Sequence, residues 1–184
     1  MIAIRMMLVL TVLTGLLYPL LMTGLAQVLF PRQAHGSRIV RDGRVVGSEL
    51  MGQQFDDPRY FWSRPSATAP FPYNTLASSG SNYGPLNPNR QKAMAARRDA
   101  LRAADEGSSA PIPIDLLTAS ASGLDPHISP ESAAYQVSRV ARLRGVDPTR
   151  IEELVRRHTA SRQFGVFGEP AVNVFLLNQD LDRL

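Results

Sequence analysis

The sequence predicts a single N-terminal transmembrane helix followed by one mixed α+β soluble domain. Three observations lead to this prediction: a long uncharged apolar run near the start, a hairpin signal soon after it, and helix starts marked by proline in the last third of the chain. The 184 residues suffice for about one ordinary domain. We therefore expect a short tail over residues 1–5, a membrane helix over 6–30 and a soluble domain over 31–184.

Composition excludes several classes of protein. The chain has no cysteine, so it is neither a disulfide scaffold, a Cys-ligated zinc domain nor a cysteine-nucleophile enzyme. Its 20 basic residues face 16 acidic ones, yet no basic run exceeds two residues, which does not favour nucleic acid as a partner. Lys92, the only lysine, lies outside any phosphate-loop pattern, so the chain is not a P-loop ATPase.

The apolar run from Met6 to Phe30 has no charge over 25 residues. A helix of this length rises about 37 Å, against a hydrocarbon core of about 30 Å. The alternative is a signal peptide with Arg5 in its basic region and a cleavage site after Ala26. Because the apolar part of signal peptides usually spans about 7 to 15 residues, the length favours a retained span.

One face of this span is predicted to pack against another helix. Pro19 displaces the carbonyl of Gly15 and leaves an acceptor that some neighbour must shield. Mostly small residues also recur at three- and four-residue steps, which allows close approach of a partner helix. The residues of this face are Thr11, Gly15, Tyr18, Pro19, Met22 and Ala26. The alternative is that such residues are common in any membrane span.

The orientation of the span is ambiguous from charge alone. Arg5 precedes it, whereas Arg32, Arg38, Arg41 and Arg44 follow it, which by the positive-inside rule would place the C-terminal part in the cytoplasm. That rule weakens when a long domain follows, because such domains cross the membrane largely regardless of charge.

The soluble part begins with a β-hairpin over residues 37–47, because two β-branched pairs flank Asp42-Gly43. Residues 56–90 are too rich in proline for helices or central strands, yet they hold six of the 13 aromatic residues. We therefore expect this segment to wrap over the core or over a partner.

Three helices and two strands are expected in the remaining sequence. We expect a helix capped by Asn89 and running to about Ala104 with a solvated basic face, and a short edge strand over 112–117. Ser129-Pro130 and Asp147-Pro148 open two further helices, the first of which ends at Gly145. The second carries Ile151, Leu154, Val155 and His158 on one face, and residues 171–177 close the chain as a strand.

The densest polar stretch, residues 118–130, is the first candidate for chemistry. A hydrolytic triad needs groups from separate elements, and no G-x-S-x-G elbow is present, so these neighbouring side chains favour a turn. We interpret them as a structural or contact loop rather than a catalytic one. Its polar residues are Ser120, Ser122, Asp125, His127 and Ser129.

A glycine-serine loop over residues 76–82 is a second, weaker candidate. Its amides offer a site for an anion, although a simple turn explains the composition equally well. The three histidines, His35, His127 and His158, show no metal-ligand spacing, so no metal site is expected.

Six ordered blocks of sequence resemble the C subunit of the bacterial Kdp potassium-transporting P-type ATPase, essentially from end to end. The blocks are Leu-Thr-Gly-Leu-Leu-Tyr-Pro over 13–19, Val-Gly-Ser-Glu-Leu-Met-Gly-Gln over 46–53, Tyr-Phe-Trp-Ser-Arg-Pro-Ser-Ala-Thr over 60–68, Tyr-Asn-Thr-Leu-Ala-Ser-Ser-Gly-Ser-Asn over 73–82, residues 117–130, and Phe-Gly-Val-Phe-Gly-Glu-Pro-Ala-Val-Asn-Val over 164–174.

The resemblance implies a non-catalytic accessory subunit, required for assembly or stabilisation of a complex in the bacterial inner membrane. The complex uses ATP and magnesium to import potassium, whereas the chain itself is expected to bind no cofactor. Its implied partners are a channel-like potassium-binding subunit, a P-type ATPase subunit and a small single-span subunit. The family's C-terminal domain is described as periplasmic, with the N-terminus in the cytoplasm.

The family is also described as a catalytic chaperone that raises the ATP affinity of the pump subunit, with nucleotide contacts at the glycine-serine loop. The residues matched to that role are Ser78, Ser79, Gly80, Ser81 and Asn82. The family more often has two glycines where Ser79-Gly80 stands, which weakens the nucleotide role. A periplasmic domain also meets no ATP, so these two descriptions of the family conflict. The residues themselves favour a scaffold, because the chain has a kinked span that needs a partner and no phosphate-binding lysine. A membrane-anchored binding module or hydrolase acting alone remains the alternative.

Overall fold

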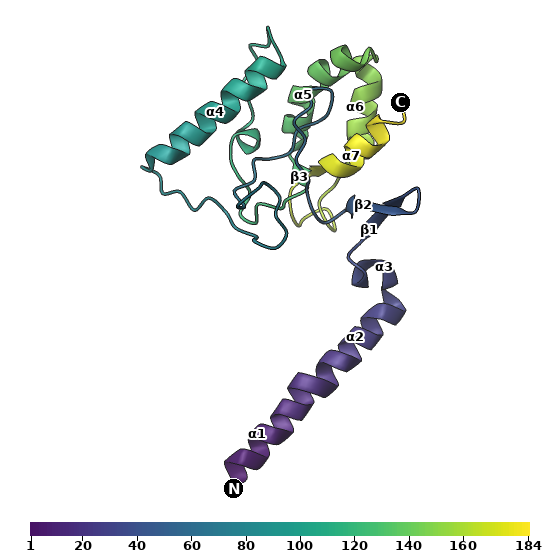
Figure 1. The fold of residues 1–184 in the computed structure, drawn as a ribbon. Helices are drawn as coiled ribbons and strands as arrows, with labels where there is room; N and C mark the ends of the chain where they lie inside the picture. Colours follow the sequence, from purple (N-terminus) through teal and green to yellow (C-terminus); the bar gives the residue numbers. More distant parts are fainter. The chain divides into compact units, whose positions relative to one another are not determined.

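The computed structural model describes all 184 residues, in two compact units over Met1–Ser48 and Glu49–Leu184. The first unit is a long helix followed by a hairpin, and the second is a mixture of helices and short antiparallel strands (Figure 1). The α+β class predicted from the sequence is therefore confirmed.

The N-terminal helix runs over Ile2–Leu29, is long and apolar enough to cross a membrane, and is covered by no other part of the chain. It consists of α1 (Ile2–Val12), a π-helical turn (Leu13–Leu17) and α2 (Tyr18–Leu29). The π turn ends where the Tyr18 N–H donates to the carbonyl of Leu13, one residue before Pro19. The sequence analysis did not predict this turn, which accommodates the missing N–H of proline by widening the helix.

The predicted hairpin is confirmed. Helix α3 (Pro31–Ala34) leads into β1 (Arg38–Arg41) and β2 (Arg44–Ser48), which pair antiparallel around Asp42-Gly43. Both turn residues have positive φ, 51° for Asp42 and 75° for Gly43, as a tight two-residue hairpin turn requires.

The second unit has one sheet and four helices. Its strands are β3 (His127–Ile128), β5 (Ala171–Asn173) and β4 (Thr159–Ala160), all antiparallel in that spatial order. Its helices are α4 (Pro88–Ala104), α5 (Pro130–Arg144), α6 (Pro148–Arg157) and α7 (Val174–Leu181). Figure 1 shows α5, α6 and α7 gathered together, with α4 apart from them.

The hydrophobic core lies between these helices, the sheet and the irregular segment. It includes Val137 and Val140 of α5, Ile151 of α6 and Leu177 of α7. From the irregular segment, Phe61 is fully buried and Trp62 is 6% exposed, which confirms that part of this segment wraps over the core.

Three local predictions were wrong. Residues 112–117 form no strand but a 3-10 turn over Ile114–Leu116, which buries Leu116. The final apolar run leaves strand β5 at Asn173, whose Oδ1 accepts the Leu176 N–H and so starts helix α7. Helix α4 is capped by Asn87 rather than Asn89, because Pro88 occupies its first position and the Asn89 N–H donates to Asn87 Oδ1 at 2.9 Å.

The basic face predicted for α4 is also only partly solvated. Arg97 packs its guanidinium over the Trp62 ring, 4.9 Å from the ring centre, and donates to the carbonyls of Ser63 and Leu116. The sequence pattern did not predict the contact between Arg97 and Trp62. An arginine on a helix gives the same pattern whether its guanidinium lies in water or over an aromatic ring.

Candidate functional site

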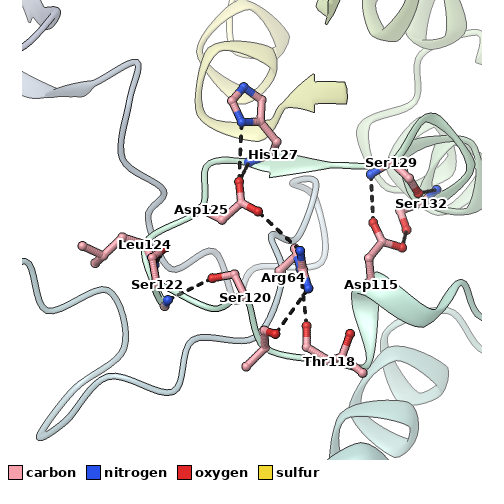
Figure 2. Close-up of polar contacts among 12 residues, drawn as sticks. Arg64, Asp115, Thr118, Ser120, Ser122, Leu124, Asp125, His127, Ser129 and Ser132 are labelled. Atoms are coloured by element: carbon pink, nitrogen blue, oxygen red, sulfur yellow. Dashed lines mark hydrogen bonds and ion pairs between the residues drawn. The ribbon is translucent and has the colours of Figure 1, made fainter. Parts of the chain in front are cut away.

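The polar loop over residues 118–130 lies against Arg64 of the irregular segment (Figure 2). Arg64 donates to the carbonyl of Thr118 at 3.4 Å and to that of Ala119 at 3.3 Å, and its Nη1 lies 3.4 Å from Asp125 Oδ2. One guanidinium therefore joins two points of the loop that lie several residues apart.

Asp125 is the central acceptor of the loop. Its Oδ1 accepts the backbone N–H of His127 at 2.9 Å and lies 3.5 Å from His127 Nδ1. Burial by itself would raise the pKa of Asp125, but the hydrogen bonds from His127 and the charge of Arg64 together hold that pKa below its ordinary value. The group is therefore a charged carboxylate at neutral pH, suited to holding the loop rather than to transferring a proton.

The three serines of the loop also bond to nearby backbone. Ser120 Oγ accepts the Gly123 N–H at 2.9 Å, and Ser122 Oγ accepts the Leu124 N–H at 3.1 Å. Ser129 Oγ accepts the Ser132 N–H at 3.0 Å and so caps α5. No serine hydroxyl hydrogen-bonds to His127, so the loop has no nucleophile and base in contact.

Asp115 ties the start of α5 to the preceding turn. Its carboxylate accepts the Ser129 N–H at 2.8 Å and the hydroxyl of Ser132 (Figure 2). A carboxylate at this position pairs with the unpaired N–H groups and the positive end of the helix. Asp115 carries no cap signal in the sequence, because its pattern predicts an edge strand.

The glycine-serine loop packs closely against the polar loop. Ser78 Oγ donates to the carbonyl of Ser122 at 3.0 Å, and Ser79 Oγ donates to the carbonyl of Ala67 at 3.4 Å. A Cβ on Gly80 would lie 2.8 Å from the carbonyl oxygen of Ala121, so only glycine permits this approach of the two backbones.

Of the two remaining residues proposed for nucleotide contact, Ser81 lies beside a groove. A groove of about 260 Å³ is lined by Ser81, Tyr83, Arg90 and Met94 among others, and Arg90 is its only cationic side chain. Asn82 has a φ of 49° at the end of the loop. Ser78 and Ser79 are thus exposed but hydrogen-bonded through their hydroxyls, Gly80 lies against the Ala121 carbonyl, and Ser81 lines the groove.

A second groove, of about 510 Å³, is lined in part by Arg64 and the polar loop. The arginine, histidine and carboxylate residues of its lining are Arg64, Asp115, Asp125, His127, Glu131 and Glu169. No group of three His, Asp or Glu residues in the chain is arranged to hold a metal ion.

The predicted packing face of the N-terminal helix lies open along its whole length. Every one of its residues from Thr11 to Met22 is exposed, and Ala26 is partly exposed. A Cβ on Gly15 would meet only the Thr11 methyl group, at 3.9 Å, so this chain itself leaves room beside the glycine. The Thr14 hydroxyl, outside the predicted face, donates to the Leu10 carbonyl at 2.7 Å.

Sequence reasoning missed a set of buried polar side chains in the core. Gln136, Arg139 and Asn178 are at most 1% exposed. Arg139 donates to the Pro58 carbonyl and to Gln136 Oε1, and its guanidinium lies 5.2 Å from the centre of the Trp62 ring. Burial lowers the pKa of Arg139 to about 10, which still leaves it charged at neutral pH. The available signal was a polar residue on an otherwise apolar helix face.

Comparison with known proteins covers nearly the whole chain. A family model described as "K+-transporting ATPase, c chain" matches residues 1–183. A protein of Methylococcus capsulatus named "Potassium-transporting ATPase KdpC subunit" is 62% identical over 182 residues, which cover 99% of this chain and 96% of that protein. Proteins of the same name from Sorangium cellulosum and Dechloromonas aromatica are 61% and 59% identical, over 98% and 99% of this chain and 95% of each relative.

Proposed function

This chain belongs to the family of K+-transporting ATPase c chains, the KdpC subunits, and on that premise we propose that it is a non-catalytic accessory subunit that assembles and stabilises a potassium uptake complex. The proposal rests on the hydrogen bonds within the polar loop, residues 118–130. Its serine hydroxyls and the Asp125 carboxylate bond to nearby backbone, and Asp125 also pairs with Arg64. Side chains with such hydrogen bonds maintain the shape of the loop surface. They do not form the contact between a nucleophile and a base that catalysis needs.

The partners proposed are those that the family resemblance implies: the channel-like potassium-binding subunit, the P-type ATPase subunit and the small single-span subunit. The open face of the N-terminal helix supports direct contact with one of them inside the membrane, because small residues let two helix backbones approach closely. Residues 6–30 would then form the span and residues 31–184 the domain outside it.

The chain is further proposed to lie in the inner membrane as a single-pass protein with residues 31–184 in the periplasm. A domain of this length crosses the membrane largely regardless of flanking charge. The arginines after the span therefore do not determine its orientation. The chain has no cysteine, so Ser109→Cys introduces a single thiol at an exposed position. A membrane-impermeant maleimide should label it on intact spheroplasts, whereas Ala3→Cys should react only after lysis. The reverse pattern would refute this orientation.

The effect on ATP affinity described for the family is proposed to act through contact with the pump subunit, and not through ATP bound by this chain. The hydroxyl groups of Ser78 and Ser79 already donate to backbone carbonyls, which supports this, because a phosphate would have to compete for these two donors. The adjoining groove also has only one cationic side chain, Arg90, which is too little positive charge to balance a triphosphate.

Affinity purification of the full chain from mild detergent tests the accessory role. Large multispan subunits should stay bound, and Asp125→Ala should lower their recovery, with potassium transport lost in proportion. Asp99→Ala is the matched control, because Asp99 is exposed and pairs only with its neighbour Arg98. Full assembly of the Asp125→Ala complex with abolished turnover would instead indicate chemistry in the loop, and a chain that purifies alone would favour an independent module.

A further inference from the structure

We propose that the hairpin next to the N-terminal helix binds the headgroup of an anionic phospholipid. The site is an open groove of about 400 Å³, here called the headgroup groove. It is lined by Pro31, Arg32, His35, Arg38, Val40 and Val45.

Short backbone hydrogen bonds fix the groove to the end of the apolar helix. The Ala34 N–H donates to the Phe30 carbonyl at 2.9 Å, and the Ser37 N–H donates to the Arg32 carbonyl at 2.9 Å. At the open end of the hairpin, where Ser48 pairs with Arg38, Ser48 Oγ donates to the Gly36 carbonyl at 2.7 Å. The helix itself ends at Leu29. A groove that begins two residues later lies at the level of the lipid headgroups if the apolar helix spans the hydrocarbon core.

The register of the hairpin gives the groove an amphipathic face. Val40 pairs directly with Val45, and Arg38 lies two residues from Val40 on the same face of β1. The two valines are 60% and 56% exposed. Exposed β-branched residues beside an arginine match a phospholipid, whose acyl chains and glycerol are apolar and whose phosphate is anionic.

The charges of this segment are unbalanced. Residues 31–48 carry four arginines and one acid, Asp42. Arg38, Arg41 and Arg44 form no ion pair with a carboxylate of the chain, and Arg41 lies directly opposite Arg44 across the hairpin, where like charges are destabilising. A phosphate supplies the missing negative charge, and guanidinium groups bind phosphate through paired hydrogen bonds.

A phospholipid fits better than a soluble anion because the apolar side chains lie in the same groove as the cations. Basic residues next to a span are attracted to anionic lipids. The inference holds for either orientation of the chain, since both leaflets present headgroups, and it does not require the accessory role in potassium uptake.

Native mass spectrometry of the full chain in mild detergent tests the site, with dioleoylphosphatidylglycerol as the probe and dioleoylphosphatidylcholine as the neutral comparator. We expect preferential retention of the anionic lipid. Arg38→Gln should reduce that retention about fivefold. Arg44→Gln is the matched control, because it removes the same charge outside the groove and should retain lipid as the wild type does.

Two further variants separate a specific effect on lipid binding from a general loss of folding. Arg38→Lys keeps the charge and should retain most of the lipid, whereas Val40→Ser keeps all charges and should weaken binding. Equal losses in Arg38→Gln and Arg44→Gln would mean diffuse attraction without a groove site. Equal retention of the two lipids, or displacement of the anionic lipid by an equal concentration of inorganic phosphate, would also overturn the proposal.

Discussion

The side-chain amide of Asn178 pairs both backbone groups of Phe61, which lies 117 positions earlier in the chain. The Phe61 N–H donates to Asn178 Oδ1 at 2.9 Å, and Asn178 Nδ2 donates to the Phe61 carbonyl at 2.9 Å. The side-chain amide of Gln136 pairs both backbone groups of Trp62 in the same way. It accepts the Trp62 N–H at 2.8 Å and donates to the Trp62 carbonyl at 3.2 Å. These amides replace the strand partner that an irregular segment lacks when its backbone is buried.

Asn178→Ala should therefore destabilise the soluble unit by about 3 kcal/mol, because it leaves two buried backbone groups unpaired. Unfolding of the full chain in detergent by guanidinium chloride measures this, with the buried Trp62 as the only tryptophan signal. Asn89→Ala, at an exposed position of α4, is the control and should change the free energy of unfolding by less than about 0.5 kcal/mol. Similar midpoints for the two variants would contradict the role assigned to Asn178.

The Asp125 carboxylate should stabilise the fold in a pH-dependent way. Its pKa is lower in the folded state than in the unfolded chain, so the stabilisation is present above the unfolded value of about 3.9 and is lost as the pH falls toward the folded value. The stability difference between wild type and Asp125→Asn should therefore shrink between pH 6 and pH 3. Denaturant titrations of both proteins across this range measure it, and a constant difference would refute the assignment.

Gly123 should tolerate no side chain. Its φ of 68° disfavours any residue with a Cβ, and that Cβ would lie 2.6 Å from Thr68 Cγ2 and 2.7 Å from the Ser79 carbonyl oxygen. Gly123→Ala should cost about 2–4 kcal/mol from backbone strain and overpacking together. Gly84→Ala serves as the control, since its Cβ meets nothing within 4 Å. Thermal unfolding of the two variants compares them, and an unchanged midpoint for Gly123→Ala would show that the loops separate freely.

Gly15→Leu should release the chain from its partners more than Thr11→Val does. Because a Cβ at this position meets nothing of this chain closer than the Thr11 methyl group, at 3.9 Å, we expect the loss to come from a clash with a neighbouring helix. Contacts between membrane helices contribute only about 0.6 to 2 kcal/mol each, so a polar change should be mild and a steric clash worse. Leu16→Ala and Leu20→Ala on other faces should be nearly silent. Equal co-purification of all four variants would mean that the span is only an anchor.

Local sequence signals predicted the elements whose cause is local. The hairpin at Asp42-Gly43 and the helix starts at Pro130 and Pro148 all depend on residues within a few positions of one another. The polar loop was likewise interpretable from its sequence, because its serines and Asp125 bond to backbone two or three residues away. The long apolar helix followed directly from hydropathy.

Predictions that depended on distant partners were wrong or missing. The short apolar runs at 112–117 and 171–177 fit either strand or helix by pattern, and only the surrounding core decided between them. The strands β3 and β4 are two residues long each and exist only because β5 lies between them. No periodicity marks so short a strand.

The sequence by itself determined the long apolar helix, the hairpin, the helix starts and, through its resemblance, the family. Tertiary structure alone decided which polar groups are buried and what they hold, such as Asn178 at Phe61, Arg97 over Trp62 and Arg64 at Asp125. The physical reason is that the hydrogen bonds of helix caps and turns join residues only a few positions apart. A buried polar group, by contrast, is stable only where a distant segment supplies its hydrogen-bond partner.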